Sequence, residues 1–198
     1  MPDTARTGPE RLTPGARRIL DAASKLFYGR GIHAVGVDTI AAEAGVTKKT
    51  LYDRFGSKDA LVVAYLEARD RRWRERLTDR VDTVPEGAPG DRLLATFDAL
   101  GEWMRTENPR GCGFANAAAE LPDAGHPARR VIAAQKEWML GYLTELAAAA
   151  GVLDPSPLAE RLMILHEGAT VLHALGTVRH PTDQARTVAA GLLAEARD

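Results

Sequence analysis

The sequence lacks most of the features that secreted, membrane and metal-bound proteins need. Its 198 residues contain a single cysteine, Cys112, which excludes an intrachain disulfide and a zinc site built from several cysteines. No run approaches the roughly 18 consecutive apolar residues that cross a membrane. The segment from Met1 to Arg18 has no apolar centre of the kind found in a secretory signal peptide. We therefore expect a cytoplasmic protein with no membrane partner.

Motifs that bind nucleotides, activate a serine or hold zinc are also missing. There is no G-x-x-x-x-G-K-[ST] loop and no G-x-S-x-G elbow, and His166-Glu167 lacks the second histidine of H-E-x-x-H. We expect no metal, no cofactor and no enzymatic activity. A helical enzyme using Cys112, Glu120 or His166 is an alternative, and convergence of these side chains in one cleft would support it.

Charge is distributed unevenly along the chain. Residues 1–80 contain 16 Lys and Arg against 11 Asp and Glu, whereas residues 81–198 contain 10 against 16. The net charge of the whole chain is only −1. This asymmetry is typical of a protein whose basic first part faces an anionic partner, although one solvated arginine-rich face would give the same count.

Good helix formers fill the stretches between the prolines, and no alternating β-branched run with hairpin turns is present. The sequence therefore predicts an all-α fold. The stretch 158–178 is apolar nearly all round, which predicts a helix buried on several sides. We expect helices over about 14–29, 38–44, 47–55, 57–84, 90–107, 113–121, 127–150, 157–178 and 182–196.

Residues 38–55 have the pattern of a helix-turn-helix, in which the second helix presents its first residues to the major groove. A tight turn at Gly45 separates the two helices, and Thr47 is placed to cap the second. Leu51 and Phe55, at i and i+4, form the inner face that holds this helix on the first. Two short helices joined by a glycine also occur in helical proteins of other functions, so the pattern alone leaves DNA binding open.

The outer face of the second helix carries groups that suit DNA. Lys48 or Lys49 can reach guanine O6 and N7 or a phosphate, and the hydroxyls of Thr47 and Tyr52 can donate to phosphate oxygens. Lys58 adds a positive charge at the start of the next helix, where a helix N-terminus already favours anions.

The run AGVTKKTLYDRFGSKDAL, residues 44–61, resembles the signature of the tetracycline-repressor (TetR) family of bacterial transcriptional regulators. The run ILDAASKLFYGRGIHAVGVDTIAAEAGV, residues 19–46, continues the match, which is strong over residues 15–65 and only architectural beyond them. The resemblance implies an N-terminal arm and helix-turn-helix head over residues 1–56, a connecting helix over 57–84, and a helical body over 85–198. The body of such a protein binds an effector and dimerises through its last two helices.

The resemblance also assigns residues to the DNA contact. Thr47, Lys48, Lys49 and Tyr52 occupy the recognition-helix contact positions of the family, and Lys58 occupies the position of a lysine that touches backbone phosphate. The expected DNA-binding set is Thr47, Lys48, Lys49, Tyr52, Arg54 and Lys58.

Two positions depart from the family pattern. Asp53 stands where relatives often carry His, Tyr or Arg near the phosphates, so either Arg54 pairs with it or Asp53 accepts from a cytosine amino group. Gly36 stands where many relatives have a Ser or Thr cap, which leaves Asp38 to support the start of the second helix.

The body contains aromatic and polar residues of the kind that line small-molecule pockets, although such residues at helical spacing also form plain core. The candidate pocket residues are Trp103, Phe114, Asn116, Glu120, Trp138, Tyr142 and His166. We expect a homodimeric repressor that a small-molecule effector releases from a near-palindromic, double-stranded DNA operator. The alternative is a DNA-binding regulator whose body binds a protein partner instead.

Overall fold

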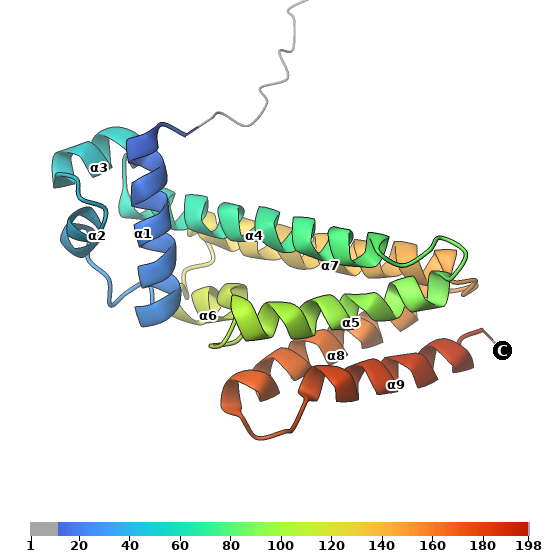
Figure 1. Ribbon diagram of the computed structural model, residues 1–198. Coiled ribbons are helices and arrows are strands. Elements are labelled where there is room, and N and C mark those ends of the chain that lie inside the picture. The colour runs from blue at the N-terminus through green and yellow to red at the C-terminus, as the bar shows by residue number, and fades with distance from the viewer. Residues whose placement is uncertain (1–11, 198) are drawn as a thin grey trace, which may run out of the picture. The chain divides into compact units, whose positions relative to one another are not determined.

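The structure is a computed structural model that describes residues 12–197, and all regular structure in that range is helical (Figure 1). Each expected helix is present with its ends within a few residues of the prediction, so the all-α fold is confirmed. The N-terminal arm expected before the first helix includes residues 1–11, which lie outside the described range. The helices are α1 (Pro14–Arg30), α2 (Val37–Glu43), α3 (Lys48–Phe55), α4 (Lys58–Asp82), α5 (Pro89–Thr106), α6 (Gly113–Glu120), α7 (Pro127–Ala149), α8 (Pro155–Leu175) and α9 (Pro181–Glu195).

Prolines determine where several helices begin. They occupy the first position of α1, α5, α7, α8 and α9. A backbone N–H at this position has no partner within the helix, and the fixed φ of proline already suits the helix, so nothing is lost there. Hydroxyl groups cap two further starts, because Thr47 Oγ1 accepts from Thr50 N at 3.1 Å and Ser57 Oγ accepts from Ala60 N at 3.0 Å.

The chain folds as two compact units, and the division between them falls within α4, between Tyr65 and Leu66. In the first unit α1, α2 and α3 pack against one another. Each helix contributes a fully buried side chain, such as Ile19 of α1, Ile40 of α2 and Leu51 of α3. Burial of these side chains holds three short helices together that would be marginal alone.

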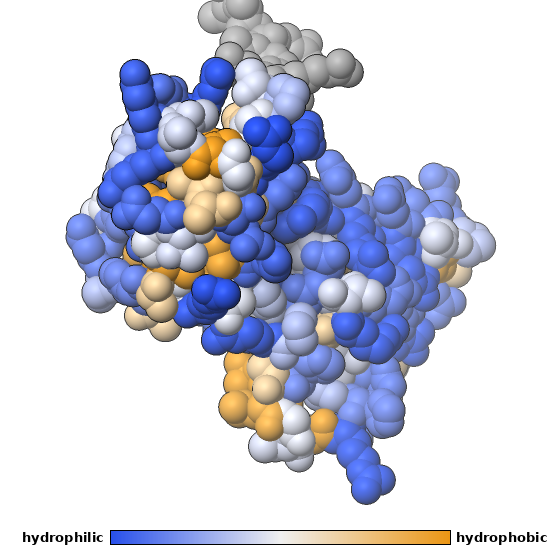
Figure 2. Space-filling view, turned by 60° about the vertical axis from the view of Figure 1, so that its left-hand side comes forward, coloured by the Kyte–Doolittle hydropathy of each residue, from blue (hydrophilic) through white to orange (hydrophobic). Residues whose placement is uncertain are grey.

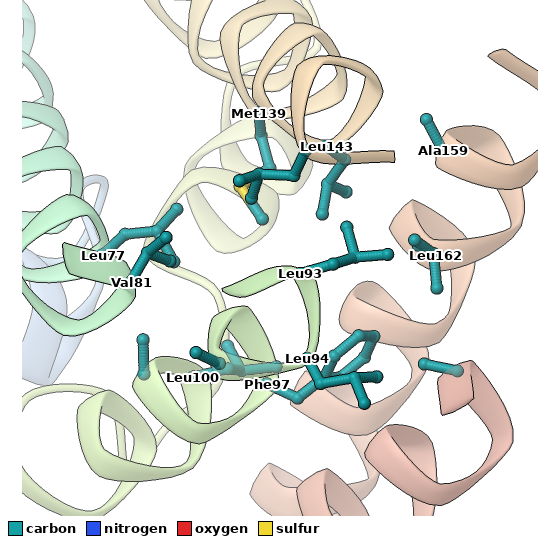
Figure 3. Packing of buried hydrophobic residues seen from close by; sticks show 14 of the residues in the cluster. Leu77, Val81, Leu93, Leu94, Phe97, Leu100, Met139, Leu143, Ala159 and Leu162 are labelled. Atoms are coloured by element: carbon teal, nitrogen blue, oxygen red, sulfur yellow. The ribbon is translucent and has the colours of Figure 1, made fainter. Parts of the chain in front are cut away.

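The second unit, described from Leu66 to residue 197, contains a large apolar core. Figure 3 shows Leu77 of α4, Leu93 and Phe97 of α5, Leu143 of α7 and Leu162 of α8 pointing toward one another. Helix α9 packs along α5 and α8, which places the last two helices of the chain side by side (Figure 1).

Helix α8 meets only part of the expectation that it is buried on several sides. It packs against α5, α7 and α9, and Leu162 and His166 are buried on that side. Its other face carries Ile164, Val171 and Leu175, whose exposed fractions are 71%, 51% and 66%. Figure 2 shows an apolar area low on the molecule, at the height of the turn between α8 and α9. The second unit therefore presents apolar surface that a single chain leaves uncovered.

Candidate nucleic-acid interface and cavity

The turn between α2 and α3 is built by the backbone. Gly45 has φ +63°, in the left-handed region that glycine enters without strain, and Val46 N donates to Ala41 O at 3.0 Å. Helix α3 then starts under the Thr47 cap, and fully buried Leu51 anchors it to the first unit. Phe55, the other expected inner residue, is half-buried. The outer face of α3 is thereby held toward solvent.

The predicted DNA-binding residues all lie within twelve positions, at the start and along the outer side of α3 and at the start of α4. Thr47, Lys48, Lys49 and Arg54 are exposed, and Tyr52 is 41% exposed although it is a large aromatic. Lys58 is half-buried at the first position of α4. The structure thus brings these residues together on one short segment, with three lysines and one arginine against Asp53 and Asp59.

Lys48 has a partner that the sequence did not indicate. Its Nζ lies 3.0 Å from Asp38 Oδ2 at the start of α2, and both side chains are exposed. Asp38 lies in the first turn of α2, but no side chain caps that helix at Gly36. An exposed ion pair of this kind contributes about 0–1 kcal/mol, so Lys48 can exchange the carboxylate for a phosphate or a base at little cost.

The sequence predicts that Asp53 either pairs with Arg54 or accepts from a cytosine amino group, and the surroundings of Asp53 bear on the first of these. No ion pair joins Asp53 to Arg54 within residues 12–197, where both side chains are exposed. Neighbouring residues on a helix point in directions about 100° apart, which separates their charged groups. Contact of Asp53 with a cytosine amino group stays a prediction.

The second unit contains a small cavity of about 40 Å³ between α4, α5, α7 and α8, next to the loop before α6. Trp103, Phe114 and His166 from the predicted pocket set line it. Asn116, Glu120, Trp138 and Tyr142 do not. The cavity is lined by Arg69, Trp73, Leu100, Trp103, Asn108, Cys112, Gly113, Phe114, Gln135, Lys136, Met139, His166, Glu167 and Thr170.

The residues that miss the cavity do so for reasons of helix geometry. Trp138 and Tyr142 lie at i and i+4 on α7 and stack on each other at 5.3 Å, with Arg74 of α4 4.4 Å above the Trp138 ring. The cavity faces the adjacent side of α7, which carries Gln135, Lys136 and Met139. Asn116 is exposed and donates to Arg110 O at 3.0 Å.

Several lining residues were not anticipated from the sequence. Arg69 and Trp73 are one turn apart on α4, and Gln135 and Met139 are one turn apart on α7. A polar residue one helical turn from a large apolar one is the signal that could have pointed to them. Such pairs also occur on ordinary amphipathic faces, so the signal is weak.

Arg69 is a buried cation at the edge of the cavity. It is 3% exposed, donates to the Asn108 side chain and to Glu107 O at 3.3 Å, and lies 5.6 Å from the Trp103 ring. Gly113 makes this position possible, because a Cβ on that residue would lie 2.5 Å from Arg69 Nε. The loop that precedes α6 is thereby packed tightly against α4.

Lys136 links three of the walls. Its Nζ lies 2.5 Å from Glu167 Oε1 on α8 and 3.4 Å from Cys112 Sγ. Burial lowers the pKa of Lys136, but the negative charges of Cys112 and Glu167 outweigh it, and the pKa is raised overall. Lys136 therefore remains an ammonium group at the edge of the cavity.

His166 is held in its neutral form. Burial, together with the charge of Lys136, lowers its pKa from 6.5 to about 3. Its ring lies 4.2 Å from Phe97, and its Nε2 lies 3.2 Å from Thr96 Oγ1. Because the Thr96 hydroxyl donates to Leu93 O at 2.7 Å, its oxygen accepts the Nε2–H of His166.

The cavity does not bring together the three residues of the enzyme hypothesis. Cys112 and His166 line it, but Glu120 does not. Nowhere between residues 12 and 197 do three or more His, Cys, Asp or Glu side chains gather in a way that could hold a metal. In the same range, none of the helices combines the length and apolar character needed to cross a bilayer.

Known protein families match this chain both in its helix-turn-helix region and in its second unit. Residues 19–65 match the family model described as bacterial regulatory proteins, tetR family, and residues 89–189 match the tetracyclin repressor-like C-terminal domain. The crystal structure of SCO4454, a TetR-family transcriptional regulator from Streptomyces coelicolor, is similar with a TM-score of 0.85 and 35% identity, covering 93% of this chain and 96% of that chain.

Curated relatives include two named as transcriptional regulators. The uncharacterized HTH-type transcriptional regulator Rv1255c of Mycobacterium tuberculosis is 31% identical over 170 residues, covering 76% of this chain and 83% of the relative. The HTH-type transcriptional regulator YjdC of Escherichia coli is 26% identical over 183 residues, covering 90% of this chain and 93% of the relative.

Proposed function

Since the chain belongs to the TetR family of bacterial regulatory proteins and is a transcriptional regulator, we propose that it acts as a cytoplasmic, homodimeric repressor released from its operator by a small molecule. The observation that carries this proposal is the exposed, basic outer face of α3, held by the Leu51 anchor and the Gly45 turn. A dimer seated on an operator blocks transcription by occupying the DNA and needs no further contact.

The chemistry of each side chain indicates whether it contacts a base or a phosphate. Lys48 or Lys49, at the start of α3, contacts guanine O6 and N7 in the major groove. Thr47, Tyr52 and Lys58 contact phosphates, which positions the helix without reading sequence. Arg54, near the end of α3, adds a further phosphate contact.

The exposed apolar face of α8 and α9 supports the dimer. Ile164, Val171 and Leu175 of α8 and half-exposed Val188 of α9 form this face, which we call the α8–α9 face. Its pairing with the same face of a second copy would give an isologous four-helix contact. Two heads related by such a two-fold axis would bind successive major grooves about 34 Å apart, so the operator should be a near-palindrome.

The cavity supports regulation by a small molecule. Arg69 and Trp73 line it from α4, and the same unbroken helix begins at Lys58 in the first unit. A ligand that displaces these side chains would shift α4, spread the two heads of the dimer and lower operator affinity. The coupling typical of such regulation is about 1–3 kcal/mol. At about 40 Å³, the cavity is far below the roughly 300–1,000 Å³ of a pocket for drug-sized ligands, so the effector is compact or the walls open.

The proposal is tested by a reporter gene placed behind an operator recovered by selection from random DNA. Expression of the chain should lower reporter output, and a variant with Lys48 and Lys49 both changed to alanine should not. A rise in reporter output with the wild-type chain would contradict repression and indicate an activator. A chain that sediments as a monomer at micromolar concentration would instead favour the alternative in which a different protein covers the α8–α9 face.

A further inference from the structure

We propose that Cys112 is the nucleophile of a covalent effector site, which forms a reversible hemithioacetal with a small aldehyde in the cavity of the second unit. The inference rests on the proposed function, because it names the chemical class of the effector. Cys112 is the only cysteine of the chain, is half-buried, and lines the cavity directly before α6. Three further features of the same cavity lead from this thiol to an aldehyde.

The first feature is the ammonium group beside the sulfur. Lys136 Nζ lies 3.4 Å from Cys112 Sγ, and Glu167 Oε1 holds the same ammonium from the other side at 2.5 Å. A thiolate is the form of cysteine that attacks electrophiles, and a positive charge at hydrogen-bond distance lies where it can interact with the negative charge on the attacking sulfur. The raised pKa of Lys136 keeps this charge in place at neutral pH.

The second feature is an unmatched acceptor. Gln135 is 3% exposed, and its Oε1 is buried without a hydrogen-bond partner in the part of the chain that the structure describes. Leaving such an atom without a partner is unfavourable, so a ligand that brings a donor to it gains affinity. Gln135 lines the same cavity as Cys112. The cavity therefore has an acceptor, Gln135 Oε1, that needs a hydrogen-bond donor, and it has a nucleophile, Cys112, in the same lining.

These two features together select the class of electrophile. Addition of a thiolate to an aldehyde converts the carbonyl oxygen into a hydroxyl, which is the donor that Gln135 Oε1 lacks. Alkylation by a halide or addition to a conjugated alkene leaves no new hydroxyl on the carbon that binds sulfur. The cavity is therefore complementary to the adduct rather than to the free aldehyde.

The third feature is size. A buried water needs about 10–15 Å³ of this kind of space, so about 40 Å³ holds roughly three heavy atoms. Acetaldehyde has that size. Its methyl group suits the aromatic lining of Trp73, Trp103 and Phe114.

The reaction balances without an oxidant or a reductant. The Cys112 thiol first loses its proton to solvent, and the thiolate then attacks the carbonyl carbon. A sulfur–carbon bond forms, the π bond of the carbonyl breaks, and its electron pair moves to the oxygen. The oxygen takes a proton from the Lys136 ammonium, and Lys136 regains one from solvent. The reverse sequence releases the aldehyde, so the site can report its concentration.

The test uses the full chain with isotopically labelled acetaldehyde, and nuclear magnetic resonance detects the hemithioacetal carbon. Wild type should form the adduct about tenfold more tightly than a peptide spanning residues 108–116, and Cys112→Ser should form none. Gln135→Leu should weaken the adduct about tenfold. Thermal unfolding of each variant checks that the cavity variants remain folded.

The role of Lys136, which lies beside the sulfur and donates a proton to the new hydroxyl, has its own readout. Lys136→Met should move the pH profile of adduct formation to higher pH and weaken the adduct about tenfold, whereas Lys136→Arg should restore the wild-type profile. An unchanged pH profile in Lys136→Met would contradict the role given to the ammonium. Wild-type binding no tighter than that of the peptide would overturn the proposal.

Operator binding separates this inference from the proposed function. Acetaldehyde should release wild-type chain from the selected operator and leave the complex of Cys112→Ser intact. If wild type binds the operator and acetaldehyde does not release it, the proposal of a covalent aldehyde effector is wrong, and the proposal of an operator-binding regulator is unaffected. If the chain binds no operator, the proposed function fails, and the adduct measurement still decides the chemistry of Cys112.

Discussion

Replacing His166 with glutamine should change how the stability of the protein depends on pH. His166 is buried beside Phe97, and its Nε2 donates to Thr96, a bond that a glutamine amide can replace. Burial and the charge of Lys136 lower the pKa of His166 from 6.5 to about 3 in the folded chain. The unfolded chain takes up a proton at the ordinary pKa, so acid favours the unfolded state.

The size of the effect follows from the two pKa values. Above about pH 6.5 both states are neutral at this position and the effect of His166 vanishes. Below it, the free energy of unfolding falls by about 1.4 kcal/mol per pH unit until the folded form also titrates near 3. Between about pH 7.5 and about pH 4.5, the loss attributable to His166 is about 2.7 kcal/mol.

Urea unfolding of wild type and His166→Gln, at one protein concentration and several pH values, measures this loss. The titration of the carboxylates is common to both chains and cancels in the difference between them. The wild-type advantage over the variant should shrink by about 2.7 kcal/mol as the pH falls from about 7.5 to about 4.5. A difference that stays constant over this range would refute the buried, neutral histidine.

Three further predictions concern DNA and the dimer. Lys58→Ala should weaken binding to all DNA sequences and flatten the salt slope by about 0.9 for each phosphate that the variant no longer neutralises, as measured by fluorescence anisotropy at several salt concentrations. Lys49→Ala should instead relax preference at one base pair in a competition assay, and identical behaviour of the two variants would remove the distinction between base and phosphate contacts. Ile164→Lys should raise the dissociation constant of the dimer about 100-fold in sedimentation, whereas Leu153→Lys, at a fully exposed loop position, should not.

The helices could be predicted from the sequence because their boundaries are local. Pro14, Pro89 and Pro181 start helices for a reason that depends on one residue, and the cap at Thr47 depends on the three residues that follow it. The turn at Gly45 is local in the same way. These features need no knowledge of the rest of the chain.

The cavity could be predicted only in part because it depends on how helices pack. Gln135 and Trp138 are three residues apart on α7 and therefore lie close together on its surface, and only the packing of α4 and α8 decides which of the two faces the cavity. The pairing of Lys48 with Asp38 likewise joins two helices and has no local signature. The all-round apolar pattern of α8 could not distinguish a face buried within one chain from a face left for a second copy.

The proposed repressor requires that α3 of two paired chains reads a specific DNA sequence. Selection of bound DNA from a random pool, with purified protein at about 0.1 M salt, tests it most directly. We expect a near-palindromic consensus whose half-sites lie about one helical turn apart, and we expect this consensus to be lost when Lys48 and Lys49 are both replaced by alanine. A pool that stays random through repeated rounds would contradict sequence-specific reading by α3 and would indicate that the function lies in the second unit.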